Sequence, residues 1–202
     1  MTIELKSIYK SYDNKSIISN LSYTFQCGKK YCFYGPSGQG KTTLLRILMG
    51  LESIDKGSIV HKNNKKSVVF QEDRLFMGFT VIENLMAVNN DYKFCINIIE
   101  KMGLLYDENT ICKNLSGGMK RRVAIARALA FNSDEYYFDE PFKGLDENTK
   151  NKVIETVNEF TKDKTCFFIT HDIQEAFDMD CIILSVENSP ISCFVEKRLN
   201  VI

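Results

Sequence analysis

Short apolar runs alternate with amphipathic segments along most of the chain, and this alternation predicts a sheet covered by helices. Strand-like patterns occupy residues 3–8, 17–25, 31–34, 67–70, 136–138, 165–170 and 181–186. Apolar positions recur with helical spacing at residues 42–49, 81–88, 94–101, 119–130, 148–160 and 172–177. Strands and helices that alternate in this way are typical of an α/β domain with a parallel sheet.

One long stretch interrupts the alternation. Between Glu72 and Asn132 the pattern is nearly all helical, which predicts a helical subdomain at residues 72–132. The nucleotide-binding core would then consist of residues 1–71 and 133–202. A length of 202 residues is sufficient for one domain of this kind and leaves no room for a second catalytic domain.

Composition narrows the classes of function. Lys plus Arg and Asp plus Glu both total 26, so the broad basic surface of a nucleic-acid-binding protein is not expected. No apolar run approaches the roughly 18 residues that a membrane span needs, and the N-terminus lacks the apolar core of a signal peptide. The seven cysteines contain no C-x-x-C pair, so we expect structural thiols and neither zinc nor disulfides. A cytoplasmic location is expected.

The strongest chemical signal follows the strand-like run at residues 31–34. The segment Gly35, Pro36, Ser37, Gly38, Gln39, Gly40, Lys41 and Thr42 matches G-x-x-x-x-G-K-[ST] and precedes a helical pattern. Its glycines let backbone N–H groups turn toward an anion, and the helix adds its positive N-terminus. Lys41 can reach the β- and γ-phosphates, and Thr42 can hold Mg²⁺. This predicts a nucleoside-triphosphate site, a property that small-molecule kinases share.

Two adjacent carboxylates, Asp139 and Glu140, follow the apolar run at residues 136–138. Open α/β sheets bind ligands at the carboxyl ends of their strands, so both carboxylates are predicted to lie beside the phosphate loop. Asp139 fits the acidic residue that associates with Mg²⁺ in phosphate-loop enzymes. Glu140 is then available to polarise a water for attack on the γ-phosphate.

A second anion-binding pattern lies in the helical stretch. Ser116, Gly117, Gly118 and Met119 open a helical segment and follow Leu115. The serine can cap the helix while the glycines leave N–H groups accessible, although a plain N-cap would give the same pattern.

Together these segments resemble the ATP-binding subunit of an ABC transporter over nearly the whole chain. The motifs follow the family's order: Tyr12, the phosphate loop, Gln71, Leu115 to Met119, Asp139 with Glu140, Gly144 to Asp146, and Ile169 to Asp172. The resemblance implies a phosphate-loop ATPase core with a parallel sheet, an N-terminal antiparallel β region and an inserted α-helical subdomain.

The resemblance also implies roles for single residues. Tyr12 would stack on adenine, and Gly35 to Thr43 would hold the triphosphate. Thr42, Asp139 and Gln71 would surround Mg²⁺. Glu140 would be the general base and His171 would contact the γ-phosphate. Ser116, Gly117, Gly118, Met119 and Asp146 would serve ATP across a dimer interface.

The implied partners are a second ATPase subunit, most simply an identical copy, and transmembrane permease subunits that an extracytoplasmic substrate-binding protein could serve. The chain would then lie on the inner face of the cell membrane. Met119 and the segments around Gln71 and Glu83 resemble importers of the nitrate, sulfonate and taurine group. Phe76, Met77 and Phe79 are candidates for the permease contact, and core packing of the helical subdomain is the alternative.

Less specific interpretations stay open for several residues. Tyr12 could be a core aromatic, Gln71 a surface residue and His171 a helix cap. We expect His61 in an exposed turn and the charged run from Lys120 to Arg122 on a solvated face. Other candidate classes are a non-transport ABC ATPase and a small-molecule kinase, but the segment from Leu115 to Met119 argues against a kinase.

Overall fold

The computed structural model describes residues 2–62 and 64–197, and within these residues the strands form two sheets. The antiparallel sheet has the order β2 (Lys15–Gln26), β1 (Thr2–Tyr12), β4 (Lys56–Val60). The larger sheet has the order β5 (Lys66–Val69), β6 (Glu135–Asp139), β7 (Thr165–Thr170), β3 (Lys30–Tyr34), β8 (Ile182–Ser185), β9 (Val195–Lys197). Its neighbouring strands are parallel except β8 and β9. The predicted fold class is confirmed.

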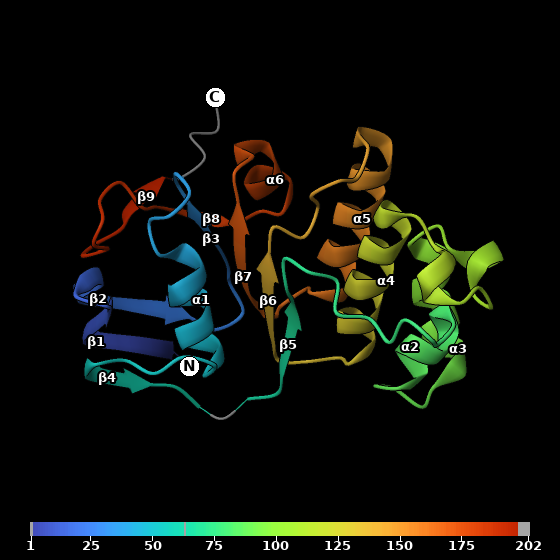
Figure 1. Cartoon of the computed structure of the whole chain (residues 1–202), viewed down its shortest axis with the longest axis horizontal. Helices are drawn as coiled ribbons and strands as arrows, with labels where there is room; N and C mark the ends of the chain where they lie inside the picture. The colour runs from blue at the N-terminus through green and yellow to red at the C-terminus, as the bar shows by residue number, and fades with distance from the viewer. Residues whose placement is uncertain (1, 63, 198–202) are drawn as a thin grey trace.

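Helices flank the larger sheet and extend beyond it at one end. They are α1 (Lys41–Met49), α2 (Val81–Met86), α3 (Tyr92–Lys101), α4 (Gly117–Ala130), α5 (Glu147–Phe160) and α6 (Ile173–Asp178). Figure 1 shows β1, β2 and β4 at one end of the molecule and α2 and α3 at the other, with the larger sheet between them. The segment before α2 and the segment between α3 and α4 hold only loops and short 3₁₀ turns (Leu105–Asp107 and Cys112–Asn114), so the expectation of nearly continuous helix there was too broad.

The larger sheet is buried on both faces, because alternate side chains along its strands enter two different apolar clusters. Tyr31, Phe33, Tyr137, Phe167, Ile169 and Leu184 pack with α1, β1 and β2. Their neighbours Cys32, Tyr136, Phe138, Cys166, Phe168 and Ile183 pack with the helices on the opposite face. A strand buried on both faces reads as a continuous apolar run, which explains why these strands were recognisable in the sequence.

The thiols agree in part with the predicted structural role. Cys32, Cys95, Cys112, Cys166 and Cys181 are buried, whereas Cys27 is half-buried and Cys193 is exposed. Burial raises the pKa of the Cys32 and Cys166 thiols to about 12, which keeps both protonated at neutral pH.

His61 does not lie in an exposed turn, so that expectation was wrong. Its Nε2 lies 2.9 Å from both carboxylate oxygens of Glu135, a fully buried residue at the start of β6. Asn64 and Tyr137 also donate hydrogen bonds to this carboxylate, at 2.7 Å each. Burial alone would raise the pKa of Glu135, but these donors outweigh it and hold the pKa below its ordinary value. The buried charge explains the interaction, because a carboxylate inside the protein requires donors.

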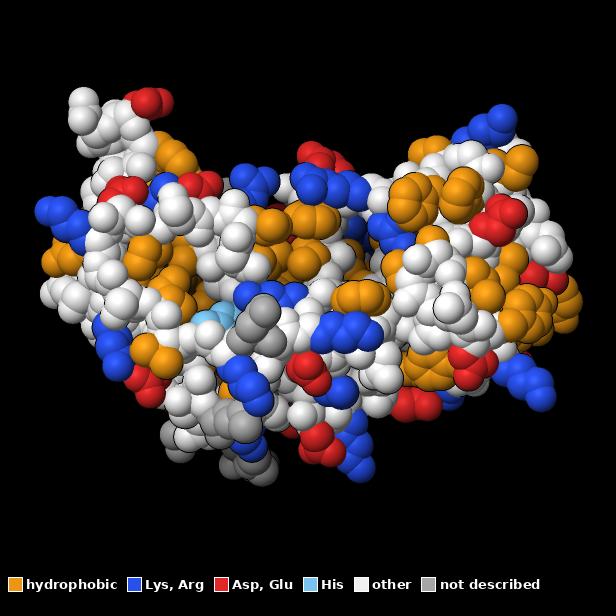
Figure 2. Space-filling model, turned by 90° about the horizontal axis from the view of Figure 1, so that it is seen from below, with side chains coloured by type: hydrophobic (Ala, Val, Ile, Leu, Met, Phe, Trp, Pro, Cys, Tyr) orange, Lys and Arg blue, Asp and Glu red, His pale blue; other side chains and the backbone are white. Residues whose placement is uncertain are grey.

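Charged and hydrophobic side chains are distributed differently over the surface. On the face shown in Figure 2, basic and acidic side chains are interspersed, and hydrophobic side chains gather at the end where α2 and α3 lie. None of the helices in the described part of the chain has the length and apolar character needed to cross a bilayer.

Candidate nucleotide-binding site

The phosphate loop joins the end of β3 to the start of α1, as the sequence predicts. Gly40 has a φ of 94°, and a Cβ added there would lie 2.4 Å from Ile17 Cγ2. Only glycine tolerates both conditions, so the loop can close tightly over the helix N-terminus. That N-terminus has no side-chain cap, and its backbone N–H groups are free to bind an anion.

The ammonium of Lys41 is buried within the loop. Its Nζ donates hydrogen bonds to the carbonyls of Gly35 at 2.7 Å and Pro36 at 2.6 Å. Burial lowers the pKa of Lys41, while the nearby carboxylates of Glu140 and Asp139 act in the opposite direction. The loop carbonyls thus hold this cation at the place where phosphate oxygens would bind.

A cavity of about 390 Å³ opens in front of the loop. Its lining combines the loop with residues from the ends of other strands: Ile17, Ser37, Gly38, Gly40, Lys41, Thr42, Thr43, Gln71, Glu140, Ile169 and His171. Segments that lie far apart in the sequence therefore meet at the carboxyl ends of parallel strands. The structure brings Gln71, Glu140 and His171 to the phosphate loop.

Side chains whose oxygen atoms could bind a metal ion lie beside the cavity. Thr42, Gln71 and Asp139 line a smaller adjoining pocket, and Thr42 interacts with the Asp139 carboxylate. Burial raises the pKa of Asp139, and the charge of Glu140 acts in the same direction. A hydroxyl, an amide and a carboxylate are the ligand types that Mg²⁺ prefers, and a bound cation would relieve the crowding of negative charge. The donor set therefore fits this ion.

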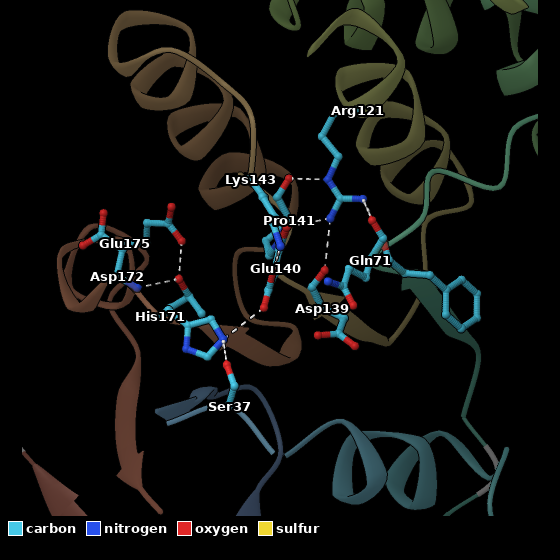
Figure 3. Close-up of polar contacts among 12 residues, drawn as sticks. Ser37, Gln71, Arg121, Asp139, Glu140, Pro141, Lys143, His171, Asp172 and Glu175 are labelled. Carbon is cyan, nitrogen blue, oxygen red and sulfur yellow. Dashed lines mark hydrogen bonds and ion pairs between the residues drawn. The ribbon is translucent and has the colours of Figure 1, made fainter. Parts of the chain in front are cut away.

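Glu140 occupies an unusual backbone position directly after β6. Its φ is 48°, and its N–H donates to the Ile169 carbonyl at 2.9 Å. The carboxylate contacts His171 through Oε1 at 3.0 Å and Lys143 through Oε2 at 2.8 Å (Figure 3). Burial alone would raise the pKa of Glu140, but the Lys143 and His171 contacts hold it below its ordinary value. The carboxylate is therefore ionised and able to accept a proton.

His171 joins this carboxylate to the phosphate loop. Its Nε2 lies 3.0 Å from Glu140 Oε1 and 3.4 Å from Ser37 Oγ. The Glu140 carboxylate can only accept, so the imidazole Nε2 carries a hydrogen in this contact. His171 thus stands between the expected base and the place of the terminal phosphate.

Arg121 contradicts the predicted solvated face, because it is only 4% exposed. It donates to the carbonyls of Phe70 at 2.6 Å, Pro141 at 2.7 Å, Asp139 at 3.0 Å and Glu140 at 2.7 Å. Its guanidinium also lies 3.2 Å from Asp73 Oδ1. Figure 3 shows the side chain reaching from α4 to both loops. A buried guanidinium needs such acceptors, and its five donors can connect three segments.

Arg122, the next residue in the charged run, is also held by backbone. Its Nη1 donates to the carbonyls of Met102 at 2.7 Å and Gly103 at 3.0 Å. The sequence contained one usable signal for the burial of Arg121. This residue lies at helical spacing between Gly118 and Ile125, on the side of α4 that faces the core. A charged run on a helix can therefore include a buried member.

The other predicted site residues lie outside the lining of the cavity. Tyr12 ends β1 and is 40% exposed, and its hydroxyl interacts with Glu52 and Thr43. Asp146 caps α5 by accepting from the Thr149 N–H at 3.1 Å. Ser116 caps α4 by accepting from the Met119 N–H at 3.3 Å, and the Met119 side chain packs on the helical core.

The fold and the cavity together define a phosphate-loop protein that binds nucleoside triphosphates. Residues 18–143 match the ABC transporter family. PhnC of Fusobacterium nucleatum, a phosphonates import ATP-binding protein, is 32% identical over 94% of this chain and 90% of its own length. SsuB 2 of Pseudomonas syringae pv. tomato, an aliphatic sulfonates import ATP-binding protein, is 34% identical over 90% of this chain and 80% of its own length.

A solved structure agrees with these sequence relatives. The ATP-binding cassette MJ0796, in a dimeric post-hydrolysis state bound to ADP and Pi, is similar with a TM-score of 0.84 and 26% identity. The match covers 97% of this chain and 99% of that one. The chain belongs to the ABC transporter family. It is an ATP-binding subunit, and it hydrolyses ATP.

Proposed function

We propose that this chain drives import through a separate permease by hydrolysing ATP between two copies of itself. The observation that carries the proposal is the meeting of Lys41, Glu140 and His171 at one cavity, next to Thr42, Gln71 and Asp139. The names of the relatives support the direction of transport, because PhnC and SsuB 2 are both import proteins. The cargo passes through the permease, so its identity depends on residues outside this chain.

In the proposed mechanism, the α1 N-terminus and Lys41 bind the phosphates while Tyr12 stacks on adenine. Thr42, Asp139 and Gln71 would hold Mg²⁺, which when bound neutralises charge on the phosphates. Glu140 accepts the proton of the attacking water as the water approaches the γ-phosphate. His171 contacts the γ-phosphate and keeps the Glu140 carboxylate beside it. Each of these residues acts from the end of a strand or from the phosphate loop.

We further propose that the segment from Leu115 to Met119 of one copy completes the ATP site of the other. Ser116, Gly117 and Gly118 lie outside the lining of their own chain's cavity. The α4 N-terminus offers backbone N–H groups, and a phosphate from the second copy would satisfy them. In this arrangement Asp146 lies at the interface, and residues 72–132 form the helical subdomain that carries this segment.

The proposed permease contact is the apolar segment between β5 and α2. Phe76, Met77 and Phe79 are 50%, 43% and 46% exposed, which favours a docking surface over core packing. Contact with permeases would place the chain on the inner face of the cell membrane. Extracytoplasmic binding proteins would reach it only through the permease.

The docking surface is tested with Phe79→Asp. We expect the tagged variant to lose its co-purifying membrane protein while its own ATP hydrolysis stays within about twofold of the unmodified chain, since a surface change outside the cavity leaves the site intact. Leu51→Asp is the matched control, because Leu51 is another exposed apolar residue and should retain the partner. Retained co-purification by Phe79→Asp would contradict the docking role.

The hydrolytic role is tested with Glu140→Gln. The amide keeps the shape of the side chain but cannot accept the proton of the water, so turnover should fall by about 10²- to 10⁴-fold. Binding of a fluorescent ATP analogue should persist, and an ATP-bound dimer should accumulate in size-exclusion chromatography. Glu159→Gln, an exposed carboxylate paired with Lys101, is the control and should turn over normally. Near-normal turnover of Glu140→Gln at saturating ATP would overturn the mechanism.

A further inference from the structure

Lys143 is a residue for which the proposed mechanism gives no role. It lies in the turn between β6 and α5, directly before Gly144. Its Nζ lies 2.8 Å from Glu140 Oε2, while its side chain is 65% exposed. Among the described residues, Glu140 is the one carboxylate within ion-pair distance of this ammonium. The turn itself is closed by a hydrogen bond from the Lys143 N–H to the Glu140 carbonyl at 3.3 Å.

The two oxygens of the Glu140 carboxylate have different partners. Oε1 faces His171 and through it the cavity, whereas Oε2 faces Lys143 in the turn (Figure 3). The backbone of Glu140 is held separately, by the Ile169 carbonyl on its N–H and by Arg121 on its own carbonyl. The backbone position is thus fixed without Lys143, and the ammonium acts on the side chain alone.

The side chain needs this second partner because the backbone does not set its direction. A glutamate has three rotatable side-chain bonds, and the left-handed backbone at Glu140 turns it sharply away from the strand. With His171 as its only contact, the carboxylate could still rotate about the line to the imidazole. A cation on the other oxygen removes that freedom and directs Oε1 toward the place of the attacking water.

An ion pair whose lysine is 65% exposed contributes little to folding, so the position of Lys143 is not explained by stability. It also lies on a short turn, where a longer-range effect on the sheet is not expected. Loss of the Lys143 ion pair should therefore affect catalysis without changing the stability of the fold.

We propose that Lys143 is a positioning residue for hydrolysis: it holds Oε2 of Glu140 so that Oε1 stays aligned with the water and the γ-phosphate. The inference depends on the general-base role proposed above for Glu140. Lys143 touches neither ATP nor the reacting atoms in this role. Its loss should therefore lower kcat and leave KM for ATP unchanged.

The test compares Lys143→Met, which keeps the length of the side chain and removes its charge, with Lys143→Arg, which keeps the charge. We expect Lys143→Met to lower kcat about tenfold, a smaller loss than removal of the base itself, with KM within about twofold. Lys143→Arg should recover most of kcat. Lys101→Met is the matched control, because it removes a surface ion pair of similar length, Lys101 to Glu159 at 2.9 Å, and should leave kcat unchanged.

The results distinguish a failure of the positioning role of Lys143 from a failure of the general-base role of Glu140. If Glu140→Gln is inactive but Lys143→Met turns over normally, the positioning role is refuted while the general-base role stands. If Glu140→Gln is active, the general-base role fails first. A rise in kcat for Lys143→Met would show that the lysine restrains the carboxylate, and it would also overturn positioning. An equal loss in Lys143→Arg would do the same.

Discussion

The N-termini of α1 and α4 are built from similar residues but have different surroundings. The α1 helix follows Gly40, whereas α4 begins with Gly117 and Gly118 after its cap Ser116, and both helices leave backbone N–H groups that can bind an anion. The α1 N-terminus carries no side-chain cap and faces a cavity of about 390 Å³ that also contains Glu140 and His171. The α4 N-terminus is capped by its own Ser116, and none of its residues lines that cavity.

The glycines show the same contrast. A Cβ at Gly40 would strike Ile17, whereas a Cβ at Gly117 would meet no atom within 4 Å. Glycine is therefore required at α1 by packing inside the chain. At α4 no atom of the chain itself requires glycine at position 117, which agrees with the proposal that a second copy brings its phosphates close to this backbone. On that proposal, one helix N-terminus forms a site alone and the other forms half of one.

The main expected effect on ATP binding comes from breaking the α1 site. Lys41→Ala removes the charged hydrogen bonds to the β- and γ-phosphates, so ATP should bind about 10- to 100-fold more weakly. Isothermal titration with a slowly hydrolysed ATP analogue measures this directly. Lys162→Ala, at an exposed lysine of the turn after α5, should bind like the unmodified chain. An unchanged affinity of Lys41→Ala for the ATP analogue would contradict binding of the phosphates by this loop.

A separate effect, on the stability of the fold, is expected from releasing the α4 N-terminus. Arg121 ties α4 to the loops that carry Gln71 and Glu140, and Arg121→Met would leave several buried carbonyls without donors. The free energy of unfolding should fall by about 2 to 4 kcal/mol in urea denaturation. Lys120→Met, the adjacent residue in the same run, should change it by less than about 0.5 kcal/mol. Equal free energies of unfolding for Arg121→Met and Lys120→Met would contradict a structural role for the buried Arg121.

The contrast between the two helices also explains what the sequence could predict. The phosphate loop and the β6 carboxylates are local patterns next to doubly buried strands, so their positions follow from neighbouring residues. The burial of Arg121 and the pairing of His61 with Glu135 depend on segments that are far apart in the chain. Both buried charges look like ordinary polar residues until the fold brings their partners together.

Short strands were missed for a different reason. Among the described residues, the strand β4 pairs only with β1 and is largely exposed, and β9 pairs only with β8. Edge strands of this kind lack the apolar runs that identify buried strands. The exposure of Phe76 and Phe79 was likewise open in the sequence, because apolar residues that pack in a core and apolar residues that dock a partner give the same pattern.

The claim that α4 completes the site of a second copy is tested most directly by mixing two inactive variants. Ser116→Arg blocks the α4 N-terminus and Lys41→Ala disables the phosphate loop, so each homodimer should be inactive. A mixed dimer contains one intact pair of surfaces, and an equal mixture should recover about a quarter of the unmodified activity, provided that the two sites act independently. No recovery on mixing, together with a specific activity of the unmodified chain that does not change with its concentration, would contradict the shared site.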